Sequence, residues 1–154
     1  MRFSSIRPPH GANAAGFSLK SNLIYENRKA LFNNTDFEKS VELVFNSITK
    51  NENICILGDY DVDGSTATSL FIRFLKAINH PYFYYIPDRR KDGYGATKKL
   101  FKKLILKKPQ LIIMVDCGSS SNEAISFLNE NKIKSLVIDH HEINKPFPKA
   151  NSII

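Results

Sequence analysis

The sequence contains no tryptophan and only two cysteines among its 154 residues. Cys55 and Cys117 each lie inside an apolar run, which favours reduced thiols in the core of a cytoplasmic protein over a disulfide. No apolar run reaches the ~18 residues that a transmembrane helix needs, so we expect no membrane span. Residues 1–17 also lack a sustained apolar stretch, which argues against a secretory signal and leaves only a weak transit peptide open.

Acidic residues are fewer than basic ones, 15 against 22, and the formal net charge is +7. Lysines cluster in the segment 98–108, KKLFKKLILKK. Such a segment is either the solvated face of a helix or a surface that attracts a polyanion, whose phosphates would supply most of the binding energy. A basic chain that concentrates aspartates in one short string suggests an anionic substrate brought to a metal site.

Short apolar runs alternate with helical patterns from residue 36 onward. Strands are predicted over 53–58, 81–87, 110–118 and 133–141. Helices are predicted over 36–49, with Asp36 as the N-cap, and over 65–79, 96–107 and 121–132. This alternation predicts an α/β fold, a parallel β-sheet flanked by helices. We expect one such domain over 36–154, preceded by an irregular or helical lead over 1–35.

Acidic and imidazole side chains directly follow three of the predicted strands. They are Asp59, Asp61, Asp63, Asp116, Asp139, His140 and His141. In a parallel sheet the carboxyl ends of the strands share one edge, and ligands bind outside that edge. We therefore expect these side chains to converge, although they are far apart in the sequence.

The string GDYDVDGSTA, residues 58–67, is compatible with three kinds of site. In an EF-hand calcium loop its three aspartates would be ligands, but Leu70 stands where the closing glutamate belongs and the preceding segment is strand-like. In a phosphatase that forms an aspartyl-phosphate, Asp61 would be the nucleophile and Asp63 the acid/base. That chemistry leaves Asp59 and the paired histidines unexplained.

The third kind of site, which the pattern favours, is a two-cation centre that hydrolyses a phosphoester. Carboxylates at alternate positions hold hard cations, and an imidazole adds a ligand that suits Mn²⁺. Two ions ~3.5–4 Å apart activate water and neutralise the leaving oxygen. Here VDCG would supply a bridging carboxylate, and DHH would supply the nitrogen ligand.

Four strings in this order resemble a known family: GDYDVDGSTATSL, YIPDRRKDGYG, MVDCGSS and IDHHE. Together they resemble the DHH phosphoesterase superfamily, and more closely its RecJ branch of exonucleases that degrade single-stranded DNA from the 5′ end. The resemblance covers roughly residues 35–145. One departure is Asp92, which stands where the second motif of this branch usually has glutamate. The family fold, a parallel sheet with a metal site at its carboxyl edge, agrees with the fold predicted from the residues.

The resemblance implies which residues bind the cations. Asp59 and Asp61 would be ligands to separate ions, Mn²⁺ or Mg²⁺. Asp116 would bridge the two ions, and His140 would be a further ligand.

The resemblance also implies roles in catalysis and substrate binding. Asp63 and His141 would act catalytically, with His141 facing the phosphate. Asp139 would orient a histidine through its second ring nitrogen. The residues expected at the substrate are Arg89, Tyr94, Lys98 and Lys102, of which the first two are alternatively a solvated charge and a packing aromatic.

Proteins of the RecJ branch carry a further metal-binding aspartate downstream of the DHH string, and a second domain that grips the nucleic acid. This chain ends at Ile154, so we expect an N-terminal fragment with a domain truncated at its C-terminus. The expected function is metal-dependent hydrolysis of single-stranded DNA from the 5′ end, in cytoplasmic DNA repair and recombination. The activity would depend on the missing region, supplied for example by a second polypeptide. The alternatives are a non-catalytic basic nucleic-acid-binding fragment or remnant, and a phosphodiesterase acting on short oligonucleotides or cyclic dinucleotides.

Overall fold

The computed structural model describes residues 35–93, 95–142 and 145–154. The predicted lead therefore lies outside the described residues except for its last position, and so does Tyr94. Residues 36–154 form one compact unit. No helix in the described part of the chain is long and apolar enough to cross a membrane.

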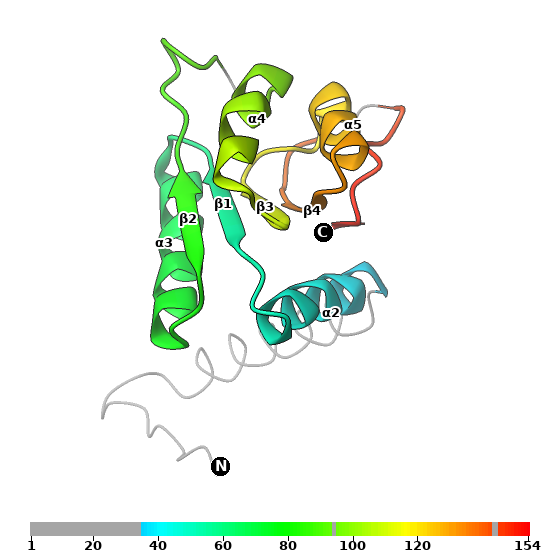
Figure 1. Cartoon of the computed structure of the whole chain (residues 1–154). Coiled ribbons are helices and arrows are strands. Elements are labelled where there is room, and N and C mark those ends of the chain that lie inside the picture. The colour runs from blue at the N-terminus through cyan, green and yellow to red at the C-terminus, as the bar shows by residue number, and fades with distance from the viewer. Residues whose placement is uncertain (1–34, 94, 143–144) are drawn as a thin grey trace, which may run out of the picture. The chain divides into compact units, whose positions relative to one another are not determined.

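The unit is built on a five-stranded sheet, as the alternation of strands and helices predicts (Figure 1). The strands are β1 (Ile54–Gly58), β2 (Tyr82–Tyr85), β3 (Leu111–Val115), β4 (Lys134–Ile138) and β5 (Ser152–Ile153). The helices are α2 (Thr35–Thr49), α3 (Val62–Ala77), α4 (Lys98–Leu104) and α5 (Asn122–Glu130), with a 3₁₀ turn at Ile105–Lys107. The strand order is β2-β1-β3-β4-β5 and every neighbouring pair is parallel. The α/β fold class predicted from the sequence is confirmed.

Three local details differ from the sequence-based expectation. Helix α2 begins at Thr35, so Asp36 lies in the first turn and the prediction of Asp36 as the N-cap is wrong. The helix predicted over 96–107 is shorter, because the chain tightens into the 3₁₀ turn and Lys108 ends it with φ +52°. Strand β5 was not predicted, since two residues are too few to give a periodic pattern.

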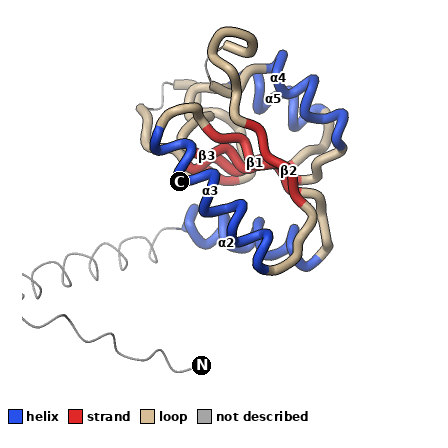
Figure 2. Tube along the Cα trace, turned by 90° about the vertical axis from the view of Figure 1, so that its left-hand side faces the viewer, coloured by secondary structure: helices blue, strands red, loops and turns tan. Residues whose placement is uncertain are grey.

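The sheet lies between two helical layers, with α2 and α3 on one face and α4 and α5 on the other (Figure 2). Strands β1 and β3 are buried at every position. Their alternate side chains feed two apolar clusters: Ile54 and Ile56 join the α2–α3 side, whereas Cys55 and Leu57 join the α4–α5 side. A sheet covered on both faces leaves its edges as the places where polar chemistry can reach solvent.

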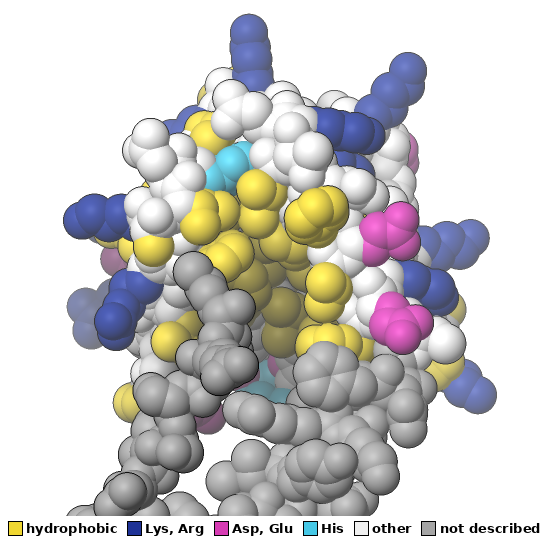
Figure 3. Space-filling model, turned by 90° about the horizontal axis from the view of Figure 1, so that it is seen from below, with side chains coloured by type: hydrophobic (Ala, Val, Ile, Leu, Met, Phe, Trp, Pro, Cys, Tyr) yellow, Lys and Arg dark blue, Asp and Glu magenta, His cyan; other side chains and the backbone are white. Residues whose placement is uncertain are grey.

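Hydrophobic side chains gather around a hollow on the face seen in Figure 3. An apolar groove of about 320 Å³ lies between α2, α3 and the β4–β5 side of the sheet. Phe45 and Phe74 line it and are 65% and 48% exposed. All of the lining side chains except that of Ser40 are hydrophobic, so this groove is not suited to an anionic substrate.

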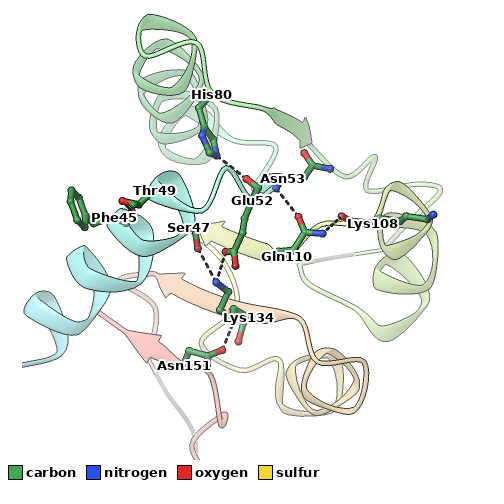
Figure 4. A network of polar contacts seen from close by, with 11 residues as sticks. Phe45, Ser47, Thr49, Glu52, Asn53, His80, Lys108, Gln110, Lys134 and Asn151 are labelled. Atoms are coloured by element: carbon green, nitrogen blue, oxygen red, sulfur yellow. Dashed lines mark hydrogen bonds and ion pairs between the residues drawn. The ribbon is translucent and has the colours of Figure 1, made fainter.

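Structural polar contacts occupy the amino ends of the strands (Figure 4). The Lys134 ammonium contacts the Glu52 carboxylate and donates to the Ser47 hydroxyl at 3.1 Å. Nε2 of the buried His80 lies 2.8 Å from the Glu52 carbonyl oxygen. These contacts tie α2 and the end of α3 to the sheet, and the predicted site residues lie at the opposite, carboxyl edge.

Candidate metal centre

The loop after β1 brings two carboxylates to the carboxyl edge of the sheet. Asp59 is 3% exposed, and its Oδ1 accepts the Tyr60 N–H at 2.7 Å. Asp61 is the N-cap of α3, with Oδ1 accepting the Gly64 N–H at 3.0 Å, and this hydrogen bond lowers the pKa of Asp61. Gly64 allows this geometry, because a Cβ there would lie 2.6 Å from the backbone of Asp59.

Asp116 follows β3 directly and is the most constrained carboxylate of the site. It has φ +59°, a left-handed conformation that aspartate tolerates better than most residues, and it is 6% exposed. Both of its carboxylate oxygens are buried and accept no hydrogen bond from the described residues. Burial, together with the nearby Asp61 carboxylate, raises the pKa of Asp116. A buried carboxylate that accepts no hydrogen bond is unfavourable unless a positive charge nearby compensates its own charge.

The segment after β4 adds a third carboxylate and two imidazoles. Asp139 Oδ2 accepts the Ser119 N–H at 3.0 Å, and Oδ1 lies 2.7 Å from His141 Nδ1. Burial alone would raise the pKa of Asp139, but the donors from Ser119 and His141 outweigh it and hold the pKa below its usual range. The same contact with Asp139 raises the pKa of His141. His140 stacks on His141 with ring centroids 4.6 Å apart, and its Nδ1 lies 3.2 Å from Asp116 Oδ1.

These side chains form two groups that share one member. Asp59, Asp61 and Asp116 bring ligand atoms within 4.8 Å of one another. Asp116, Asp139, His140 and His141 do the same. The convergence predicted from the parallel sheet is thus confirmed for these six residues. Carboxylate oxygens with an added imidazole, around a buried carboxylate that accepts no hydrogen bond from the described residues, fit a site for Mg²⁺ or Mn²⁺.

The other predicted residues lie around this core. Asp63 is exposed in the first turn of α3 and belongs to neither group of ligand atoms. Arg89 is exposed, and its Nη1 donates to the Tyr60 hydroxyl at 2.8 Å. Lys98 forms an ion pair with Glu123 at 3.4 Å. Lys102 is exposed in the last turn of α4.

A cavity of about 500 Å³ borders the metal centre. It lies between the beginnings of α4 and α5 and extends to Asp139 and His141. Lys98 is one of its lining residues, so the start of the lysine-rich segment reaches this cavity. Lys102 is not among the lining residues, and its predicted contact with substrate remains a prediction.

Sequence reasoning missed two residues that contact the site. Tyr60 lies between Asp59 and Asp61 in the sequence. Its side chain is 42% exposed, and its hydroxyl accepts a hydrogen bond from Arg89. Ser119 supplies the backbone donor that helps to fix Asp139. Both lie inside strings that were singled out for their charged residues. Only the position of Ser119 within a strand-end turn could have signalled its role as a backbone donor.

Residues 53–154 match the family model described as "DHH family, N-terminal domain". The chain belongs to the DHH family. It is 32% identical over 117 residues to the single-stranded-DNA-specific exonuclease RecJ of Bacillus subtilis, and 35% identical over 118 residues to that of Haemophilus influenzae. Each alignment covers 76% of this chain, but only 15% and 20% of the two relatives. The chain therefore spans about a fifth or less of the length of these relatives.

Solved structures of relatives share the fold, and two of them show how far the likeness extends. A crystal structure of exonuclease RecJ bound to manganese matches with a TM-score of 0.69 and 30% identity, covering 76% of this chain and 30% of that one. A crystal structure of RecJ from Thermus thermophilus in complex with Mn²⁺ matches with a TM-score of 0.65 and 25% identity, covering 77% and 16%. Both relatives bind manganese, which agrees with a divalent-cation site in this family.

Proposed function

We propose that this chain carries the metal centre of a nuclease that hydrolyses single-stranded DNA from the 5′ end, using two divalent cations, Mn²⁺ or Mg²⁺. Its membership in the DHH family and its similarity to RecJ exonucleases support the class of reaction. The observation that carries the proposal is the position of Asp116, which belongs to both groups of ligand atoms while its oxygens accept no hydrogen bond from the described residues.

In this proposal the carboxylates divide the cations between them. Asp59, Asp61 and Asp116 would hold the two ions, and the His140 ring, whose Nδ1 lies 3.2 Å from Asp116 Oδ1, would add a nitrogen ligand. When bound, the two cations lower the pKa of an attacking water molecule and neutralise the charge on the leaving oxygen.

The paired aspartate and histidine act on the phosphate. Asp139 holds Nδ1 of His141 at 2.7 Å, which fixes the ring and leaves Nε2 as the nitrogen able to meet a phosphate oxygen. Because the pKa of His141 is raised, the ring keeps its second proton to a higher pH than a free histidine does. Asp63 supports proton transfer from the first turn of α3.

The substrate would reach this edge along cationic and aromatic side chains. Arg89 contacts Tyr60, the residue between Asp59 and Asp61 in the sequence, with the guanidinium carbon 5.6 Å from the ring centroid. Such a pair suits single-stranded DNA, whose phosphates attract arginine and whose bases stack on aromatic rings. Lys98 lines the neighbouring cavity, and Lys102 and Tyr94 complete the proposed contacts.

This chain would contribute the metal centre and the residues next to it. The relatives' complete activity is proposed for this chain together with a region corresponding to the rest of their length, on the same or a second polypeptide. The reaction would take place in the cytoplasm, where two buried thiols remain reduced.

The proposal is tested with Mn²⁺ titration calorimetry on this chain, and with a cleavage assay on the same preparations after a region corresponding to the rest of the relatives' length has been supplied. The substrate is a 5′-labelled single-stranded oligonucleotide, with the corresponding duplex as a control. Asp116→Asn is expected to weaken Mn²⁺ binding at least about tenfold and to abolish release of 5′ mononucleotides. Asp36→Asn, the same substitution on an exposed aspartate of α2, should retain metal binding and cleavage.

Two results would contradict the proposal in different ways. If the Asp116→Asn variant and the unaltered protein bound Mn²⁺ with equal affinity, Asp116 would not be a metal ligand and the proposed metal centre would be wrong. Salt-sensitive binding of the oligonucleotide without cleavage, even after the remaining RecJ-like region is supplied, would instead indicate a nucleic-acid-binding module.

A further inference from the structure

A buried carboxylate outside the metal centre anchors the loop that follows β2. The side chain of Asp92 is 3% exposed, and Lys103 donates to its Oδ1 at 2.7 Å. Its Oδ2 accepts the Tyr85 hydroxyl at 2.6 Å and the Asp88 N–H at 3.2 Å. Three donors from β2, from the loop and from α4 therefore meet on one carboxylate. The contacts with Lys103 and Tyr85 lower the pKa of Asp92 to about 2.

The backbone of the loop closes around the same residue. The Asp92 N–H donates to the Asp88 carbonyl oxygen at 2.8 Å, and the Arg90 N–H donates to Asp88 Oδ1 at 2.9 Å. Residues 88–92 are thereby drawn into one compact turn. Gly93 follows with φ +85°, a left-handed conformation that glycine adopts readily, and a Cβ added there would meet no atom within 4 Å.

The turn brings Arg89 into contact with Tyr60, in the loop that carries Asp59 and Asp61. Its guanidinium lies over the Tyr60 ring and donates to the Tyr60 hydroxyl at 2.8 Å. Tyr60 in turn lies between the candidate ligands Asp59 and Asp61 in the sequence. Arg89 is exposed, so its own contact with Tyr60 is too weak to fix the loop. The restraint must come from the buried end of the turn.

We propose that Asp92 is a positioning residue, whose bonds to Lys103 and Tyr85 hold the 88–92 turn so that Arg89 stands ready at the metal edge to meet a substrate phosphate. Asp92 itself touches neither substrate nor cation; it acts through Arg89. Without the Asp92 contacts, Arg89 samples many positions. Binding of DNA must then order the Arg89 side chain, and this entropy cost lowers the affinity. This inference rests on the proposed function, since it assumes that an anionic substrate reaches the Arg89 side of the metal centre.

A double-mutant cycle tests the coupling. The measured quantity is the affinity for a 5′-phosphorylated single-stranded oligonucleotide, read by fluorescence anisotropy with Ca²⁺ in place of Mn²⁺. Arg89→Ala is expected to weaken binding about tenfold. Asp92→Asn should weaken it several-fold, and the double variant should be no weaker than Arg89→Ala alone. Asp92→Glu, which keeps the charge, should retain most of the affinity.

Two additional variants separate positioning from general damage. Asp36→Asn removes an aspartate that also pairs with a lysine, at 3.2 Å, on α2, and it should leave the affinity unchanged. Tyr85→Phe removes one donor and keeps the ion pair, so it provides a milder test if Asp92→Asn fails to fold. The NMR signal of the Arg89 side-chain Nε–H should move in Asp92→Asn and Tyr85→Phe, and much less in Asp92→Glu.

The inference is overturned if the two losses of affinity add, or if the Arg89 signal is unaffected by Asp92→Asn. It is also overturned if Arg89→Ala leaves the affinity unchanged. In each of these results the Mn²⁺ titration and the cleavage assay still report independently on the metal centre. Unchanged Mn²⁺ affinity in Asp116→Asn, or absence of cleavage by the unaltered protein once the RecJ-like region is supplied, would count against the proposed function and would leave the double-mutant cycle to be interpreted separately.

Discussion

Gly64→Ala tests how the fold positions the first carboxylate of the metal centre. Gly64 lies in the first turn of α3, pressed against the loop after β1. An added Cβ would lie 2.6 Å from the Asp59 nitrogen and from its carbonyl oxygen, whereas ordinary contacts begin at 3.4 Å. The helix and the loop must therefore separate by about 0.8 Å, and rotating a side chain cannot relieve the clash because both contacts are backbone atoms.

Two magnitudes follow from that displacement. Overpacking costs about 1–3 kcal/mol, and alanine offsets about 0.5–1 kcal/mol of it through its better helix propensity, so we expect a net loss of at most about 2.5 kcal/mol of unfolding free energy. The site is sensitive to the same displacement, since metal–ligand distances tolerate changes of only about 0.2 Å. Displacing Asp59 should lower Mn²⁺ affinity at least about tenfold.

Urea unfolding and Mn²⁺ titration calorimetry on the same variant measure both effects. Gly93→Ala is the matched control: it adds the same atom where nothing lies within 4 Å, and only its φ of +85° opposes the change. That control should lose about 1–2 kcal/mol of stability and keep its metal affinity. If Gly64→Ala bound Mn²⁺ as tightly as the unaltered protein, the close approach of α3 would not be what positions Asp59.

Three further predictions concern the rest of the fold. Burial raises the pKa of Cys55 to about 12 and raises that of Cys117 as well, so neither thiol should react with a chromogenic disulfide reagent at pH 8 until urea is added; rapid reaction of the native protein would contradict this. Lys134→Met should cost about 1–2 kcal/mol in urea unfolding, because it leaves the half-buried Glu52 carboxylate without its ammonium partner, and adding Glu52→Gln should restore part of the loss. The pKa of Asp92 is depressed from 3.8 to about 2, so its carboxylate stabilises the fold above about pH 4 and this contribution disappears as the pH falls towards 2. Between about pH 4 and pH 2, the unfolding free energy of the Asp92→Asn variant should change less than that of the unaltered protein. If the two proteins lost stability equally over this range, the pKa of Asp92 would not be depressed.

Much of the fold could be predicted because its signals are local. Four of the five strands are short apolar runs with polar or glycine-rich ends, which a single pass along the sequence detects. The elements that were not predicted depend on contacts between segments that are distant in the sequence. Strand β5 has only two residues, and it is a strand because it pairs with β4 through Leu136 and Val137. The tight 3₁₀ turn after α4 depends on how the chain must enter β3.

The candidate site was predicted in outline, and the comparison of Asp63 with Asp116 shows where sequence reasoning stops. Both are aspartates in a recognisable string after a strand. Asp63 continues into α3 and lies exposed, whereas Asp116 turns inward with φ +59° beneath the histidines. Which of several neighbouring carboxylates becomes buried depends on backbone direction at the strand end, and this direction is not encoded in the spacing of the residues.

The sequence by itself determined the parallel α/β architecture, the edge at which chemistry is possible and the types of ligand that would meet there, because strand periodicity and residue chemistry are properties of short segments. The tertiary structure decided that Asp116 belongs to both groups of ligand atoms, that Asp139 holds His141, and that Asp92 anchors the turn bearing Arg89. Each of these depends on the distance between atoms from segments far apart in the chain, and such distances exist only once the sheet and its two helical layers have packed.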